Sequence, residues 1–263
     1  MPVREFELRG AHIEIHDDAA TACRAAAERI ASIIDHARGT RGRAVLGLAT
    51  GNTPIRVYEH LVRMHREGNL SFEHVHTFNL DEYYPMSAFD PNSYRRYMHE
   101  RLFEAVGLES NQTHIFDGSV PAAFADEHAA QFDRWIEAEG GLDLQLLGIG
   151  RNGHIGFNEP VDLPVETALT LGSRLVELHP ITKEDAALEF GSPVAVPDRA
   201  LTMGPATILG AREILVLAFG ERKSVVVGRA LGPEIGMELP ATLLQRARGR
   251  VTWILDPAAA SDL

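Results

Sequence analysis

The stretch Ala44-Val-Leu-Gly-Leu-Ala-Thr-Gly-Asn-Thr-Pro-Ile-Arg-Val-Tyr-Glu-His-Leu-Val-Arg-Met-His-Arg66 decides the fold. Its first five residues are apolar on both faces, which is typical of a buried strand in a parallel sheet. Residues 54–66 follow with helical periodicity. Thr53 suits the N-cap position and Pro54 the first helical position, so the helix is predicted to begin there. The stretch therefore predicts a strand–loop–helix unit of an α/β protein.

The same alternation continues along the chain. Further strands are predicted at 75–79, 142–148, 213–219 and 250–255. Helices are predicted at 93–106, at 122–139 closed by Gly140-Gly141, and around 222–231; the alanine-rich stretch 19–27 is expected to be a helix face and 257–260 a C-terminal tail. No linker or repeat divides the chain. These patterns predict one domain, 1–263, with a Rossmann-like open, mostly parallel sheet and helices on both faces.

Composition limits the partners of the protein. The 263 residues contain 25 Lys+Arg and 37 Asp+Glu, a formal charge of -12, which argues against nucleic acid or an anionic membrane surface as a partner. The longest basic cluster, 246–250, is predicted to be a surface turn. The single cysteine, Cys23, excludes a disulfide framework and a multi-cysteine metal site. The N-terminus lacks the apolar core of a secretory signal, and no run of 18 apolar residues is present, so we expect a cytoplasmic protein.

Four loops at predicted strand ends carry unusual residues, and ligands of parallel α/β sheets bind at such ends. In the loop 49–54, backbone amides and hydroxyls at a helix start suit a phosphate group. The residues expected to hold it are Thr50, Gly51, Asn52 and Thr53. In the loop 219–223, Lys223 stands in the first turn of a predicted helix, where a cation is unfavourable unless an anion compensates it. The alternatives are an ordinary capped turn and a lysine that faces solvent.

The other two loops carry acid–base groups. Asp81 and Glu82 follow a strand, and Asp81 is a candidate general base; the alternative is helix capping or a solvated acidic turn. In the segment 147–160, four glycines are expected to let the loop wrap a ligand closely, and His154 and Glu159 supply an imidazole and an orienting carboxylate. One histidine and one carboxylate fall short of the usual three protein ligands, so no metal site is predicted.

In this order the four loops resemble the glucosamine-6-phosphate deaminase/isomerase family, which is related to the 6-phosphogluconolactonases. The resemblance spans about residues 20–256. Its most specific strings are Phe-Asn-Leu-Asp-Glu-Tyr (78–83) and Gly-His-Ile-Gly-Phe-Asn-Glu-Pro (153–160), and Ala-Leu-Thr-Met-Gly (200–204) is also similar to the family. The lactonase relatives typically continue with Thr-Ala-Ser after the histidine, so the string here favours the deaminase branch.

The resemblance implies conversion of an amino-sugar phosphate to fructose 6-phosphate and ammonia, without a metal or redox cofactor. By position, His154 would open the pyranose ring, with Glu159 orienting it. Asp81 would move the proton between C2 and C1 through an enolamine, with Glu82 nearby in support. The phosphate would be held by Thr50, Gly51, Asn52, Thr53 and Lys223.

Several positions depart from the family pattern. Asn152 stands where many members carry an aspartate that assists the histidine, and it keeps hydrogen bonding without charge. The segment 178–190 lacks the arginine that commonly clamps the phosphate; Lys183 would replace it only as a point charge. Arg174 matches a basic position linked with allosteric activation in some relatives, whereas Val176 replaces a second one. We therefore expect an altered or lost activator site and leave the preferred sugar phosphate open.

Two alternative functions stay open from the sequence: a sugar-phosphate lactonase on the same fold, and a non-catalytic sugar-phosphate sensor. The retained Asp81, Glu82, His154 and Glu159 argue against a sensor, because a sensor has no use for a base at C2. The oligomeric state is also open, since relatives occur as monomers and as trimer-based hexamers.

Overall fold

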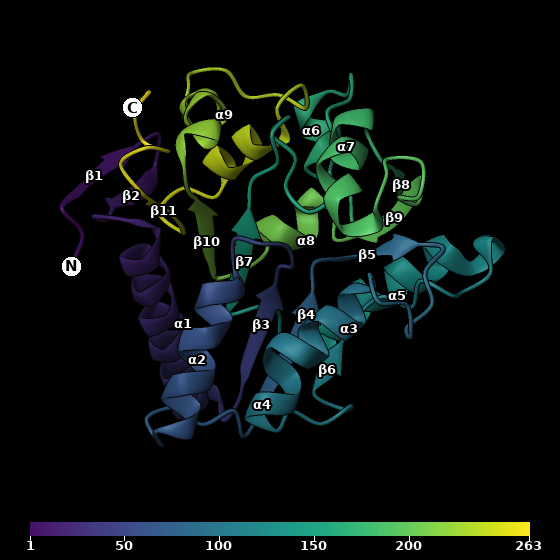
Figure 1. Ribbon diagram of the computed structural model, residues 1–263, viewed down its shortest axis with the longest axis horizontal. Helices are drawn as coiled ribbons and strands as arrows, with labels where there is room; N and C mark the ends of the chain where they lie inside the picture. Colours follow the sequence, from purple (N-terminus) through teal and green to yellow (C-terminus); the bar gives the residue numbers. More distant parts are fainter.

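The computed structural model describes all 263 residues, and an eight-stranded sheet forms its centre (Figure 1). The strand order is β1-β2-β11-β10-β7-β3-β4-β6, and every neighbouring pair is parallel except β1 and β2. The strands are β1 (Arg4–Leu8), β2 (Ala11–Ile15), β3 (Ala44–Leu48), β4 (Val75–Asn79), β6 (Thr113–His114), β7 (Leu144–Gly148), β10 (Glu213–Ala218) and β11 (Val251–Leu255). The predicted mostly parallel sheet is confirmed.

Helices cover both faces of this sheet. One face carries α1 (Ala19–Arg41), α2 (Ile55–Arg66), α3 (Tyr94–Met98), the π-helical turn η1 (His99–Phe103) and α4 (Glu104–Val106). The other face carries α5 (Ala125–Ala138), α8 (Pro205–Leu209), α9 (Ser224–Ala230) and η4 (Pro240–Arg246). Neighbouring residues of one strand enter opposite cores: Leu215 packs on the α1 side and Val216 on the α5 side. This alternation explains why the strands are apolar on both faces.

The chain order reverses at the boundary between β3 and β7. From β3 the chain adds β4 and β6 on one side, and from β7 it adds β10 and β11 on the other. Loops after the two boundary strands therefore leave in opposite directions and open a crevice at their carboxyl ends. These carboxyl ends point towards α7 (Pro180–Phe190), which lies beyond them (Figure 1). The topology thus places a ligand crevice where the predicted loops lie.

A second, antiparallel sheet lies at the carboxyl ends of these strands, and the sequence patterns did not predict it. Its order is β5-β9-β8, formed by β5 (Asp81–Tyr84), β9 (Arg199–Thr202) and β8 (Arg174–Glu177). Asp81 pairs with Thr202, so the segment after β4 continues as a strand rather than as the expected loop. The short helix α6 (Val165–Ala168) and the 3-10 turns η2 (Ala122–Phe124) and η3 (Glu221–Lys223) complete the fold.

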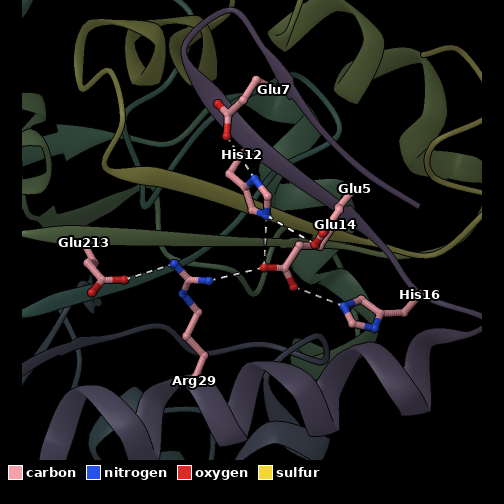
Figure 2. A network of polar contacts seen from close by, with 7 residues as sticks. All are labelled: Glu5, Glu7, His12, Glu14, His16, Arg29 and Glu213. Atoms are coloured by element: carbon pink, nitrogen blue, oxygen red, sulfur yellow. Dashed lines mark hydrogen bonds and ion pairs between the residues drawn. The ribbon is translucent and has the colours of Figure 1, made fainter. Parts of the chain in front are cut away.

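A polar network fastens the N-terminal hairpin to the rest of the sheet (Figure 2). Arg29 of α1 donates to Glu14 of β2 at 3.2 Å and to Glu213 of β10 at 3.3 Å. His12 lies 3.0 Å from Glu7, and the same ring also approaches Glu5 and Glu14. His16 contacts the second oxygen of Glu14 at 3.3 Å. Arg29 and its two carboxylate partners therefore join α1 to β2 and β10, and His12 connects β1 to the same network.

Two predicted details are corrected, and a third is confirmed with a local difference. Pro54, not Thr53, occupies the N-cap position of α2, because the carbonyl of Pro54 accepts the first helical N–H, which is that of Tyr58. The segment 257–260 is no free tail: Ala259 and Ala260 are buried in the core beside α9. The predicted helix 93–106 is present as a continuous helical run from Tyr94, although its middle widens into a π-turn. No helix is both long enough and apolar enough to cross a membrane.

Candidate active site

A cavity of about 230 Å³ lies at the crevice, and all four predicted loops reach it. The predicted residues that line it are Thr50, Gly51, Asn52, Thr53, Asp81, His154 and Lys223. Glu82, Asn152 and Glu159 do not line it and instead stand behind lining residues. Four larger hollows, of about 500 to 870 Å³, contain none of these residues. We place the candidate site in the smaller cavity because its polar groups converge there.

The loop between β3 and α2 forms one end of the cavity. Gly51 adopts φ +95°, a conformation that a side chain would strain, and an added Cβ would meet open space. The first N–H groups of α2 have no partner within the helix and are available to an anion. The carbonyls of the loop are held from outside the cavity: Tyr97 donates its hydroxyl to Gly51 at 2.6 Å, and Tyr58 donates to Ala49.

Lys223 brings a cation to the same cavity. It ends the 3-10 turn η3 and stands at the N-cap of α9, close to the predicted first helical turn. Its Nζ donates to the carbonyl of Ile149 at 2.7 Å, which draws the ammonium to the glycine-rich loop after β7. Burial lowers the pKa of Lys223; Asp185 opposes this shift and Arg151 adds to it.

Lys183 does not provide a second cation. It lies on α7, does not line the cavity, and its Nζ pairs with Asp198 at the surface. The structure therefore does not place Lys183 where it would replace the missing arginine. Thr182, its neighbour, does line the cavity, and its hydroxyl lies 3.2 Å from Nδ1 of His154.

Asp81 and Glu82 have different surroundings although they are adjacent. Alternation along β5 turns Asp81 into the cavity and Glu82 away from it. Burial, reinforced by the charge of Glu82, raises the pKa of Asp81 well above its ordinary value. Glu82 accepts three backbone N–H groups, from Tyr83, Tyr94 and Arg95, at 3.0 to 3.1 Å. Burial nevertheless raises the pKa of Glu82 to about 7. Asp81 is thus a strong candidate base, whereas Glu82 is fully engaged with backbone.

His154 is held by a ring of polar partners. Its Nδ1 lies 2.7 Å from Oδ1 of Asn152 and 3.4 Å from Oε2 of Glu159. Asn152 also donates its Nδ2 to Glu159 at 2.8 Å. Because both oxygens accept, they favour the tautomer with the proton on Nδ1, and Nε2 is left for the cavity.

Glu159 keeps its charge in this setting. Burial alone would raise its pKa, but hydrogen bonding and charge from His154, with hydrogen bonds from Thr182 and Asn152, lower it below the ordinary value. The carboxylate also accepts the backbone N–H of His179 at 3.3 Å. An ionised carboxylate beside Nδ1 orients the imidazole and stabilises its protonated form.

The glycines of the segment 147–160 lie at positions where the loop packs closely. A Cβ on Gly150 would lie 2.2 Å from the ring of His154, and one on Gly153 would lie 2.5 Å from Leu239. One on Gly156 would approach the hydroxyl of Thr202 at 2.9 Å. Close packing thus requires glycine at these three positions, and Gly148, Gly150 and Gly156 also line the cavity, where the loop was expected to approach a ligand.

Further lining residues were not predicted from sequence, namely Tyr83, Tyr94, Thr182, Asp185 and Glu189. They come from β5, α3 and α7, whose approach to the cavity depends on tertiary packing. Arg174 lies away from the cavity on β8, where it donates to the carbonyl of Gly172 at 3.3 Å. No cluster of three or more His, Cys, Asp or Glu side chains is arranged to hold a metal ion.

Comparisons with known proteins agree with this geometry. Residues 17–253 match the family described as glucosamine-6-phosphate isomerases/6-phosphogluconolactonase. A glucosamine-6-phosphate deaminase of Rhodopirellula baltica is 45% identical over 241 residues, which cover 90% of this chain and 92% of the relative. Another, of Halothermothrix orenii, is 43% identical over 220 residues, which cover 84% of this chain and 88% of the relative. The solved structure of a monomeric glucosamine-6-phosphate deaminase superimposes with a TM-score of 0.87 at 36% identity, covering 95% of this chain and 99% of that one. A 6-phosphogluconolactonase of Trypanosoma brucei, at 23% identity and a TM-score of 0.76, shares the fold.

Proposed function

The chain belongs to the glucosamine-6-phosphate isomerase/6-phosphogluconolactonase family, and from this membership we infer that it converts glucosamine 6-phosphate and water to fructose 6-phosphate and ammonia. One observation carries the inference: the cavity joins a buried carboxylate, an imidazole and a phosphate-type loop, on a chain 43 to 45% identical to two glucosamine-6-phosphate deaminases. The 6-phosphogluconolactonase of Trypanosoma brucei is only 23% identical to this chain, and at that level the likeness shows a shared fold and no shared activity.

The phosphate group of the substrate belongs at the loop of residues 50–53. Backbone amides at the start of α2, the hydroxyls of Thr50 and Thr53, and the ammonium of Lys223 supply donors to the phosphate oxygens. This end of the cavity fixes the sugar, so that its C1 and C2 atoms reach Asp81 and His154. Binding energy from the phosphate thereby orients the reacting carbons.

His154 opens the pyranose ring. Its Nε2 exchanges a proton with the ring oxygen and the anomeric hydroxyl, which yields the open-chain aldehyde. Asn152 and Glu159 hold the Nδ1 proton, and the negative charge of Glu159 stabilises the imidazolium that forms during the transfer. Asn152 contributes a hydrogen bond without charge, so Glu159 is the sole carboxylate in contact with this ring.

Asp81 then moves one proton between two neighbouring carbons. It removes the proton from C2, which gives an enolamine, and returns it to C1, which gives a ketimine at C2. Water adds to the ketimine, and ammonia leaves as fructose 6-phosphate forms. A carboxylate with a raised pKa suits this task, because it must accept the proton, hold it and release it on one face of the substrate.

A coupled ammonia assay tests the proposal. Glucosamine, galactosamine and mannosamine 6-phosphates are supplied in turn, and 6-phosphogluconolactone hydrolysis is measured beside them. We expect ammonia from glucosamine 6-phosphate and, in deuterated water, deuterium at C1 of the product. Turnover of the lactone alone would establish the lactonase alternative, and tight binding without any turnover would establish a sensor.

The proposed substrate is a small phosphorylated amino sugar, and the setting of the reaction is the cytoplasm. Nucleic acid and membrane surfaces are not proposed as partners, since the formal charge is -12. Size-exclusion chromatography with light scattering distinguishes a monomer from a trimer-based hexamer.

A further inference from the structure

Glu82 stands next to the proposed base, yet it contacts no part of the cavity. The residue is 2% exposed, and it does not line the cavity. Its Oε1 accepts the backbone N–H groups of Tyr83 and Tyr94, both at 3.0 Å, and its Oε2 accepts that of Arg95 at 3.1 Å. Two of these donors belong to the first turn of the helical run that begins at Tyr94. The carboxylate therefore clamps that run to β5.

The same helical run holds the phosphate loop. Tyr97 is one turn beyond the clamp, and its hydroxyl donates to the carbonyl of Gly51 at 2.6 Å. Tyr94 lines the cavity and contacts the hydroxyl of Tyr83 at 3.2 Å. A continuous path of hydrogen bonds thus leads from β5, through Glu82 and the helix start, to the loop that receives the phosphate.

We propose that Glu82 is a positioning residue that sets the distance between the phosphate loop and Asp81. The proposal rests on the proposed function, because a sugar phosphate has a fixed span between its phosphate group and C2. Asp81 precedes Glu82 on the same strand. The helix that Glu82 holds contacts the phosphate loop through Tyr97, so this contact fixes the position of the loop relative to Asp81. A displacement of about 1 Å at a reacting centre can lower the rate about a hundredfold. A small shift of the phosphate loop relative to Asp81 would therefore slow the reaction.

The chemistry of the contact explains why the position needs a carboxylate. Three N–H donors converge on two oxygens, and an ionised carboxyl group accepts from all of them. Glutamine has one oxygen and would turn an NH₂ group towards one of the donors. The substitution Glu82→Gln therefore keeps the volume and weakens the clamp at one point.

Three variants and one probe test the proposal. The variants are Glu82→Gln, Tyr97→Phe and their combination, and the probe is inorganic phosphate, titrated by calorimetry without turnover. Loss of about one hydrogen bond should raise the Kd of phosphate about fivefold in each single variant, with KM for glucosamine 6-phosphate rising in parallel and kcat falling less. Because both changes act on one path, the double variant should lose less than the product of the single effects.

Tyr84→Phe is the matched control. It removes a tyrosine hydroxyl from the same strand, but that hydroxyl donates to Val120 at 2.7 Å, away from the loop. Its phosphate affinity and KM should equal those of the unmodified protein. If Tyr84→Phe weakens phosphate as much as Tyr97→Phe, the effect is a general loss of packing and the proposal fails.

Other outcomes decide the remaining cases. A fall in kcat for Glu82→Gln with an unchanged phosphate Kd would assign Glu82 to the chemical step and overturn the proposal. Should Glu82→Gln not fold, Tyr97→Phe carries the test, and an unaltered phosphate Kd in that variant refutes the path. Failure of the proposed function is separate: the unmodified protein would then release no ammonia, while phosphate titrations of the variants still report on the clamp.

Discussion

Glu159→Gln isolates the electrostatic part of ring opening. Glutamine keeps the shape of the side chain and removes the charge that lies 3.4 Å from Nδ1 of His154. At that distance a unit charge interacts with an imidazolium by about 1 kcal/mol in a water-like medium and by about 5 kcal/mol at an effective dielectric constant of 20. We therefore expect kcat/KM to fall by a factor between about ten and a few thousand, since about 1.4 kcal/mol corresponds to tenfold.

The assay separates ring opening from binding. Ammonia release from glucosamine 6-phosphate reports the whole reaction, whereas the open-chain alditol analogue of the substrate binds without any ring to open. In Glu159→Gln the rate should fall and the affinity for the alditol should stay within about twofold. Glu184→Gln is the matched control, because Glu184 is an exposed carboxylate that pairs with Arg151 at 3.0 Å and does not contact His154.

Three results would refute this reasoning. Equal activity of Glu159→Gln and the unmodified protein would show that the charge of Glu159 contributes nothing to the step. A loss of alditol affinity as large as the loss of rate would show that Glu159 shapes the binding site rather than stabilising the imidazolium. A loss in Glu184→Gln of similar size would point to the net charge of the region instead of one contact.

Three further predictions concern single residues. Asp81→Asn should lower kcat by about 10²–10⁴ in the ammonia assay. Because burial raises the pKa of Asp81, ionisation of this carboxyl group destabilises the folded protein. The free energy of unfolding of the unmodified protein should therefore fall relative to that of Asp81→Asn as the pH rises above the ordinary carboxyl pKa of about 4. Urea denaturation at several pH values measures this, and a difference that stays constant with pH would contradict it. Lys223→Gln should raise KM about tenfold or more with a smaller change in kcat, and the salt dependence of KM should weaken, because a charge-assisted contact to phosphate is lost. Arg29→Ala should lower the unfolding free energy by about 1 kcal/mol, because its ion pairs with Glu14 and Glu213 are partly exposed; urea denaturation measures it, with unchanged kcat as the check that the site is untouched.

The main sheet could be predicted from sequence because its strands are buried on both faces. Runs such as 44–48 and 213–218 are apolar at every position or nearly so, and a following helix marks each crossover. The second sheet could not be predicted in this way. Its strands have four residues each and pair across distances such as Asp81 to Thr202, so no local pattern identifies them. Their stability comes from pairing and packing that the linear sequence does not display.

The pair Asp81-Glu82 shows how far residue types alone can lead. From sequence, a general base and a helix cap were both open for these carboxylates. The structure divides them: Asp81 lines the cavity, and Glu82 caps the helical run that starts at Tyr94. Which carboxylate faces the cavity depends on the alternation of side chains along β5, a strand that could not be predicted. The sequence could therefore assign an acid–base role to the pair, but it could not say which of the two residues has that role. The role of Tyr97 could not be predicted either, because its contact with Gly51 joins residues 46 positions apart in the sequence.

The formal charge of -12 is compatible with a phosphorylated substrate because the positive site is local and rigid. Among the candidate phosphate groups, Lys223 supplies the single cationic side chain, since Lys183 pairs with Asp198 at the surface. The remaining donors are amides and hydroxyls of the loop 50–53, and neutral donors bind an anion well only when they already converge before it arrives. Tyrosines fasten this loop from two helices, and Glu82 fastens one of those helices to the strand of the base. In the proposed binding mode, preorganisation of this loop takes over part of the role that the family resemblance implies for a clamping arginine. The affinity for phosphate should then depend on the Glu82 clamp as much as on the charge of Lys223.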